Sequence, residues 1–237
     1  MGYGGYGVSI PAFFNPLLVA WLERGGVYAV AHVRGGGEKG RRWYEDGRRD
    51  KKMNGVRDFL ACADYLVAKH YTSPAKLAAQ GVSMGGVLIG RAIDERPELF
   101  AAAIIEAGVL DPVRIAAWPN GPGQEDDLGS PDTATGMAGL LAMDPYQNVR
   151  PHAPYPGVLL VVGLNDQRVP PWMSGKFAAR VAAATTSGRP VWLRVDGEAG
   201  HGGIAGSEAQ IEAVTADELS FVLEQAGDPQ FQPAAAR

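Results

Sequence analysis

The chain has 237 residues, 46% of them hydrophobic and 20% charged, and this composition excludes an intrinsically disordered chain. Lys and Arg number 22 against 26 Asp and Glu. The resulting formal net charge of −4 argues against a nucleic-acid partner, because no surplus of cations can neutralise phosphates. No run reaches about 18 apolar residues, so we expect neither a transmembrane helix nor a membrane partner.

Cys62 is the single cysteine, and one cysteine can form neither an internal disulfide framework nor a cysteine-only metal cluster. It fits a reducing compartment. The first residues lack the charged segment and the apolar run of a signal peptide. A cytoplasmic protein is therefore the default expectation.

Apolar, strand-like runs alternate with helix-like segments along the chain. In order, we expect a strand over 27–33, a helix from the N-cap residue Asn54 to residue 67, a strand over 77–82, a helix over 85–95, strands over 101–107 and 157–163, a helix beginning near Pro171, a strand over 191–195 and a helix over about 207–225. The last helix should turn four apolar residues inward: Ile211, Val214, Leu219 and Val222. This alternation predicts an α/β fold, a mostly parallel sheet with helices on both faces.

Residues 111–156 break this rhythm, because they carry many prolines together with several glycines. We interpret them as an excursion over the sheet, partly helical, within a single domain of residues 1–237. In open α/β sheets such excursions at the strand ends shape the ligand site.

A G-x-S-x-G motif, Gly81-Val82-Ser83-Met84-Gly85, lies between a predicted strand and a predicted helix. In that setting a serine is held on a strained turn, with glycines on both sides because a Cβ there would clash. The helix N-terminus and the Met84 amide can stabilise a developing oxyanion. The alternative interpretation is an ordinary glycine-rich turn.

An acid and a base follow Ser83 in the order that a hydrolase of this kind requires. Asp166 lies just past the strand over 157–163, and His201 follows the next strand. Serine needs a base to take its proton, and the base needs an acid to fix its tautomer. Asp111 also follows a strand and is the rival acid, but Asp166 directly precedes the strand that leads to His201. The other histidines are expected to be structural or solvated: His32, His70 and His152.

Five motifs, in order, resemble the catalytic domain of the prolyl oligopeptidase family of serine peptidases, from Tyr3 to about residue 225. They are Tyr3-Gly4-Gly5-Tyr6, Arg34-Gly35-Gly36-Gly37-Glu38, Gly81-Val82-Ser83-Met84-Gly85-Gly86, Asp166-Gln167-Arg168-Val169-Pro170 with Lys176-Phe177, and Ala199-Gly200-His201-Gly202. The resemblance implies an α/β-hydrolase fold and a serine-type endopeptidase or oligopeptidase. It also implies peptide substrates and a reaction that needs no cofactor and no metal.

The family's catalytic roles carry over to matching positions of this sequence. Ser83 would be the nucleophile, His201 the general base and Asp166 the acid that orients the base. The Tyr3 hydroxyl and the Met84 backbone N–H would form the oxyanion hole.

The resemblance also implies a substrate pocket. Arg168 would hold a substrate carbonyl, and three side chains would line the pocket for the residue before the scissile bond: Tyr6, Val109 and Val169. Prolyl oligopeptidases proper stack a tryptophan on the substrate proline, and the matching position here is Gln124. Trp118, six residues earlier, could substitute only if the excursion folded differently. We therefore expect a specificity that is broader than, or different from, cleavage after proline.

A second departure concerns the start of the chain. Family members carry an N-terminal β-propeller before this domain, and this sequence starts at the tyrosine of the oxyanion hole. We therefore expect an N-terminally truncated hydrolase domain: a truncated reading frame, a fragment or a minimal relative. An unpaired sheet edge would favour marginal solubility or a homo-oligomer.

Three functional hypotheses follow. The first is a serine peptidase acting on short peptides through an acyl-enzyme on Ser83. The second is an esterase or general acyl hydrolase on the same triad, since a fold does not fix the substrate. The third is an inactive catalytic-domain fragment whose triad is present but not assembled.

Overall fold

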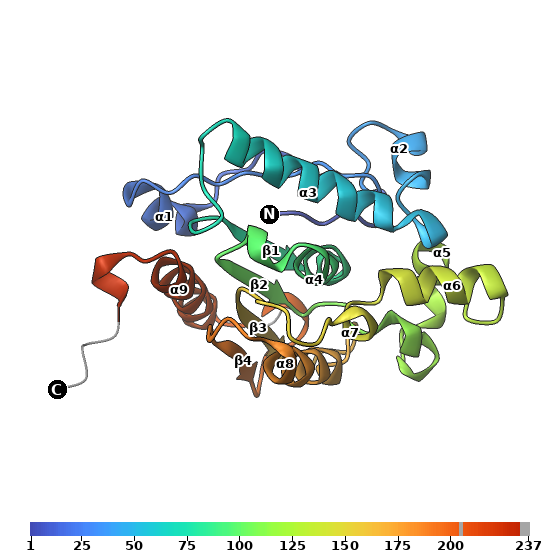
Figure 1. Cartoon of the computed structure of the whole chain (residues 1–237). Helices are drawn as coiled ribbons and strands as arrows, with labels where there is room; N and C mark the ends of the chain where they lie inside the picture. Colours follow the sequence, from blue (N-terminus) through green and yellow to red (C-terminus); the bar gives the residue numbers. More distant parts are fainter. Residues whose placement is uncertain (204–205, 233–237) are drawn as a thin grey trace.

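Four parallel strands form the central sheet in the computed structural model, which describes residues 1–203 and 206–232. The strands lie in the order β1-β2-β3-β4 (Figure 1). They span β1 Ala78–Val82, β2 Ala102–Glu106, β3 Gly157–Gly163 and β4 Val191–Asp196. Because all pairs are parallel, the carboxyl ends of the strands meet at one edge of the sheet, where ligand sites of such sheets form.

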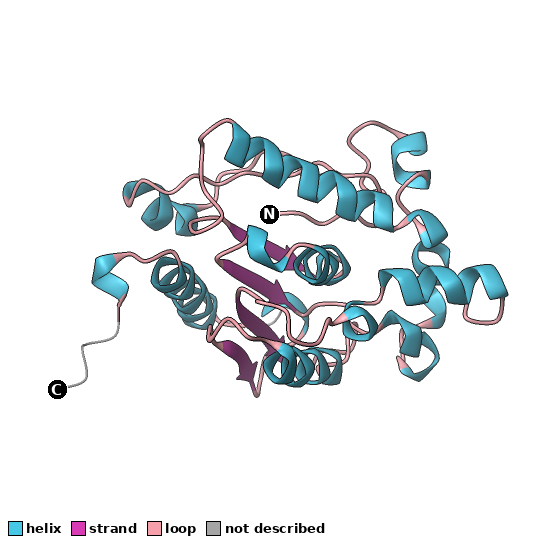
Figure 2. Cartoon of the chain, in the orientation of Figure 1, coloured by secondary structure: helices cyan, strands magenta, loops and turns pink. Residues whose placement is uncertain are grey.

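Helices cover both faces of this sheet (Figure 2). The described helices are α1 Val19–Glu23, α2 Arg41–Glu45, α3 Met53–Ala68, α4 Gly85–Glu95, α5 Glu125–Leu128, α6 Ala134–Met143, α7 Pro145–Asn148, α8 Trp172–Ala184 and α9 Glu208–Gln225. Helices α4 and α8 pack on one face, with α3 outside α4, and α9 packs on the other face (Figure 1).

Alternate residues of the central strands feed two separate cores, as the period of two in a strand requires. Ile105 and Leu160 belong to the larger core with the residues of α4 and α8. Ile104 and Leu159 belong to the smaller core with Phe221 of α9. Strand β3 is buried along its whole length, as its continuous apolar run predicts.

The predicted strands over 77–82, 101–107, 157–163 and 191–195 are present within one residue at each end, and the helix over 85–95 is α4. The strand predicted over 27–33 is wrong. Within the described residues, this segment forms only an isolated parallel bridge between Ala31 and Gly2.

Two helical details also differ from the prediction. Asn54 does not cap α3 but lies inside its first turn, where its side-chain amide donates to the Asp46 carbonyl at 2.8 Å. The N-cap residue is Lys52. In α9, Ser207 forms a capping box with Gln210, but Ile211 remains 43% exposed because this part of the helix faces a cavity instead of the sheet.

Between β2 and β3 the chain leaves the sheet and returns through α5, α6 and α7, with 3₁₀ turns over Pro112–Ala117 and Pro122–Gln124. The excursion expected over 111–156 is thus partly helical. Within the described residues, no helix combines the length and the apolar character needed to cross a membrane.

Candidate active site

Ser83 occupies the turn between β1 and α4 and has a φ of +55°, a conformation that is strained for an L-residue. Hydrogen bonds hold the turn on three sides. The Ser83 N–H donates to the Glu106 carbonyl, and the Ser83 carbonyl accepts from the N–H groups of Gly86 and Val109, each at 2.9 Å. A Cβ on Gly86 would lie 2.6 Å from the Cα of Gly108, so only glycine fits there. The turn therefore presents Ser83 at the carboxyl edge of the sheet.

Asp166 lies just beyond β3, with its carboxylate held by three groups. Its Oδ1 accepts from the N–H groups of Arg168 and Val169 at 2.8 Å each, and its Oδ2 lies 2.7 Å from His201 Nδ1. Burial raises the pKa of Asp166, but the hydrogen bonds from His201 and the two N–H groups outweigh it, and the net shift is downward. Asp166 is therefore an anion near neutral pH and can orient the imidazole.

The loop that carries His201 lies against the ends of the strands. Gly163, at the end of β3, approaches the Ala199 carbonyl so closely that a Cβ would collide with it. One residue after His201, the Cβ position of Gly202 lies 3.6 Å from the side chain of Val82, the residue before Ser83. Because Nδ1 faces Asp166, Nε2 is the ring nitrogen that remains for a second partner; no hydrogen bond joins it to Ser83 in the described residues.

Tyr3 lies on the N-terminal segment that runs beside β1, where the Gly2 N–H donates to the Gln80 carbonyl at 3.0 Å. Its side chain is half-buried, and burial raises the pKa of Tyr3, while a side-chain hydrogen bond with Ser83 and the charge of Arg168 oppose the shift. The phenol thus stays protonated and can donate its O–H. Met84, the N-cap residue of α4, places a backbone N–H beside the same serine.

Tyr6 and Gln124 lie together, because the Tyr6 hydroxyl donates to the Gln124 side-chain carbonyl. The Tyr6 ring lies 6.3 Å from the Tyr3 ring, centroid to centroid. Its backbone N–H donates to Asp127 Oδ1 at 2.9 Å, and Asp127 Oδ2 forms a buried ion pair with Lys52. A charge pair inside the protein thus fixes the position of Tyr6.

The Arg168 backbone is fixed on both sides, since its N–H donates to Asp166 and its carbonyl accepts from the Trp118 indole. The Arg168 side chain is exposed. Trp118 itself is 2% exposed, so its ring is not presented to a substrate. Val109 and Val169 are buried in the larger core. The Val109 N–H donates to the Ser83 carbonyl, and the Val169 N–H donates to Asp166 Oδ1.

The structure places Asp166 beside His201, whereas the rival acid Asp111 forms an ion pair with Lys176. Sequence reasoning missed Lys52, Asp127 and the indole contact of Trp118. The two charged residues are 75 positions apart, and a single sequence gives no signal that pairs them. In residues 1–203 and 206–232, no group of three or more His, Cys, Asp or Glu side chains is arranged to hold a metal ion.

Known proteins are similar to this chain over most of its length. The family model described as "Prolyl oligopeptidase family" matches residues 13–229. The chain is 36% identical over 226 residues to a prolyl endopeptidase of Elizabethkingia meningoseptica, covering 95% of this chain and 32% of that protein. It is 36% identical over 228 residues to dipeptidyl aminopeptidase BI of Pseudoxanthomonas mexicana, covering 95% of this chain and 31% of that protein.

Solved structures are similar over the same span. A prolyl endopeptidase structure superposes with a TM-score of 0.92 at 40% identity, covering 95% of this chain and 33% of that one. Oligopeptidase B from Leishmania major gives a TM-score of 0.90 at 30% identity, covering 100% of this chain and 33% of that one. The predicted α/β-hydrolase fold is thereby confirmed. The chain spans about a third of the length of the curated relatives it matches.

Proposed function

The chain belongs to the prolyl oligopeptidase family, and we propose that it is a serine peptidase that hydrolyses short peptides through an acyl-enzyme on Ser83. The observation that carries the proposal is the joint geometry of three residues. Ser83 stands on a strained turn, and His201 Nδ1 lies 2.7 Å from Asp166 Oδ2 in a loop that abuts that turn. The names of the relatives, prolyl endopeptidase and dipeptidyl aminopeptidase, agree with peptide hydrolysis.

The chemistry follows from these positions. His201 Nε2 takes the Ser83 hydroxyl proton while Oγ attacks the peptide carbonyl, and Asp166 stabilises the imidazolium. The Tyr3 hydroxyl and the Met84 N–H donate to the oxyanion. Collapse of the tetrahedral intermediate breaks the C–N bond of the peptide, and His201 gives the proton to the leaving amine. Water then attacks the acyl-enzyme by the same route and releases Ser83.

The substrate contacts of this proposal lie around Tyr3. Arg168 projects an exposed guanidinium near the Tyr3 phenol and is assigned to a substrate carbonyl. Tyr6 is assigned to the pocket for the residue before the scissile bond, whereas Val109 and Val169, which are buried, would support that pocket from the core. Gln124, hydrogen-bonded to Tyr6, offers an amide where a ring would stack on proline, so a specificity other than strict post-proline cleavage is proposed.

Two further properties belong to the proposal. Strand β4 is at the edge of the sheet and exposes Trp192, Leu193 and Val195, which favours a homo-oligomer through an edge. The thiol of Cys62 is free and exposed, which suits the reducing cytoplasm.

The test is intact-mass analysis after reaction with a fluorophosphonate, with Ser83→Ala as the matched control. We expect one adduct on the natural chain and none on the variant. The same protein should then cleave p-nitroanilides ending in Pro, Ala, Phe and Lys. No adduct on folded protein would refute the catalytic proposal. A Pro preference above about a hundredfold would refute the proposed specificity, since one pocket contact rarely discriminates further without a dedicated partner.

A further inference from the structure

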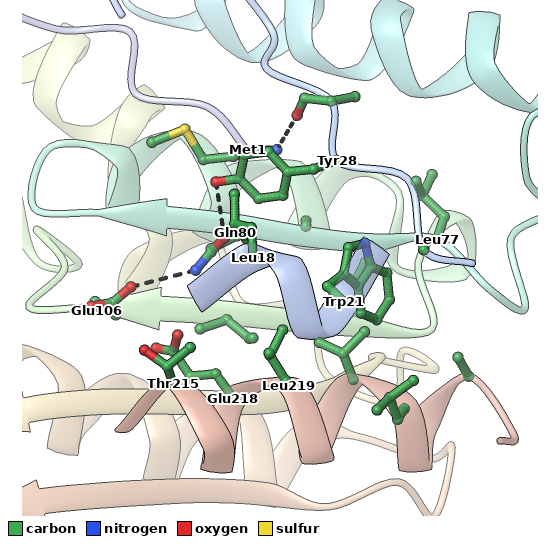
Figure 3. Close-up of a pocket in the computed structure, with 18 of the residues that line it drawn as sticks. Met1, Leu18, Trp21, Tyr28, Leu77, Gln80, Glu106, Thr215, Glu218 and Leu219 are labelled. Carbon is green, nitrogen blue, oxygen red and sulfur yellow. Dashed lines mark hydrogen bonds between the residues drawn. The ribbon is translucent and has the colours of Figure 1, made fainter. Parts of the chain in front are cut away.

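A cavity of about 1070 Å³ lies between helix α9, the α1 region and the sheet (Figure 3). Ser83 does not line it, although Gly202, the residue after His201, does. Apolar side chains supply most of its wall, among them Leu18 and Trp21 of the α1 region, Leu77 beside β1 and Leu219 of α9. Val27, which also lines it, is 65% exposed, so the cavity communicates with solvent. Its volume is at the upper end of the range for small-molecule sites.

Two carboxyl groups enter this apolar space from opposite sides, Glu106 from the end of β2 and Glu218 from α9 (Figure 3). Gln80 donates its side-chain amide to Glu106 Oε1 at 3.5 Å, and the Tyr28 hydroxyl lies 3.4 Å from Gln80 Oε1. Glu218 is only 6% exposed, and its Oε1 has no hydrogen-bond partner in the part of the chain that the structure describes. A buried acceptor without a hydrogen bond lowers the stability of the fold unless a donor from a ligand or from water satisfies it.

We propose that this cavity binds an amphipathic amine, with an apolar body against the α1 and α9 walls and an ammonium head between Glu106 and Glu218. Glu218 and Glu106 hydrogen-bond each other, and an ammonium group would bring three donors and a positive charge to this pair in place of the proton that they share. A fatty acid would place a third carboxylate beside the pair, and a neutral alcohol would leave most of the charge interaction unused. The inference is independent of the peptidase proposal.

The protonation of the two carboxyls agrees with this choice. Burial raises the pKa of Glu218 to about 9, and the facing Glu106 adds to the shift. Burial also raises the pKa of Glu106, although hydrogen bonds from Glu218 and Gln80 oppose it. The other charged groups that act on Glu218 are Arg194 and Asp217, which bond each other at 2.7 Å. The pair therefore retains a proton near neutral pH.

An arriving ammonium group favours the ionised carboxyls, so binding should release a proton to the solvent. Tyr28 near the pair stays neutral because burial raises its pKa. Burial lowers the pKa of the Met1 amino group, which also lines the cavity, to about 6, so this amine is largely neutral above that pH. Amine affinity should therefore rise between pH 6 and pH 8, whereas the affinity for a neutral ligand of the same length should stay constant. When binding releases one proton, the affinity for the amine rises by up to about tenfold for each pH unit.

The test is isothermal titration calorimetry of the whole chain with n-decylamine, n-decanol and decanoate. We expect decylamine to bind at least about tenfold tighter than decanol, the factor expected for one charge-assisted hydrogen bond, and decanoate to bind weakest. Glu218→Gln should abolish the preference of amine over alcohol. Glu212→Gln, an exposed carboxyl on the same helix that does not line the cavity, should leave it unchanged.

Proton release provides a second measurement that needs no variant. Titrations of the natural chain in two buffers of different ionisation enthalpy should report about one proton released per decylamine bound. Equal affinities for amine and alcohol, an unchanged preference in Glu218→Gln, absence of proton release or absence of decylamine binding would each overturn the proposal.

Discussion

Lys52 and Asp127 form an ion pair that is almost wholly removed from water, with side chains 4% and 2% exposed. Replacing Lys52 by Met would leave a buried carboxylate whose Oδ1 accepts only the Tyr6 N–H at 2.9 Å. Breaking a buried pair in this way costs about 3–5 kcal/mol. At roughly 2–4 °C per kcal/mol for a chain of this size, Tm should fall by about 6–20 °C.

The double variant Lys52→Met/Asp127→Asn should recover most of this loss, because no buried charge remains and the Asn oxygen still accepts from Tyr6. The matched control is Lys51→Met, which removes an exposed pair with Asp46 at 2.9 Å and should cost less than about 1 kcal/mol. Thermal and urea unfolding of the four proteins measure these differences. If Lys52→Met costs no more than Lys51→Met, the pair is hydrated in solution and does not position Tyr6.

Four further outcomes follow from the structure. Ser83→Gly should be about 1 kcal/mol more stable than Ser83→Ala in urea, since glycine accepts a φ of +55° without strain; equal stabilities would contradict this. Gly86→Ala should abolish fluorophosphonate labelling, because the new Cβ would lie 2.6 Å from backbone atoms. The control Gly175→Ala lies in α8, where a Cβ would have no atom within 4 Å, and its free energy of unfolding should rise by about 0.5–1 kcal/mol. Arg168→Ala should lower kcat/KM for a peptide by about tenfold or more and barely change that for a small activated ester; equal losses would exclude a carbonyl contact. The folded pKa of Asp166 is lowered, so the stability advantage over Asp166→Asn should persist above about pH 4 and disappear as pH falls further, in a series of thermal melts.

The positions of Ser83 and Asp166 in the fold could be predicted because their signals are local. The turn at Ser83 needs a short strand, two close glycine contacts and a helix start, all within a few residues of the chain. The end of β3 likewise places Asp166 at the edge where strands of a parallel sheet gather. These features depend on backbone sterics and strand direction, so the sequence order alone carries them.

The interactions that failed prediction depend on distant partners. Residues 27–33 have strand-like side chains, but the part of the chain that the structure describes contains only an isolated bridge there, between Ala31 and Gly2. Ile211 follows the helical period of α9, yet it is exposed because the helix stands off from the sheet there. Periodicity assigns a face to a helix but cannot say whether another element fills the space opposite that face.

The two acidic sites of this chain show how hydrogen-bond donors, and not burial alone, decide the charge of a carboxyl group. Asp166 and Glu218 are each 6% exposed. Asp166 receives two backbone N–H groups and His201, and its pKa falls. Burial, together with the facing Glu106, raises the pKa of Glu218 to about 9. A carboxylate that already accepts hydrogen bonds from the protein stays ionised and can orient a base. A carboxyl group that lacks such donors is stabilised most by a ligand that supplies them. The same reasoning supports both proposed roles, Asp166 in orienting His201 and Glu218 in binding a cation.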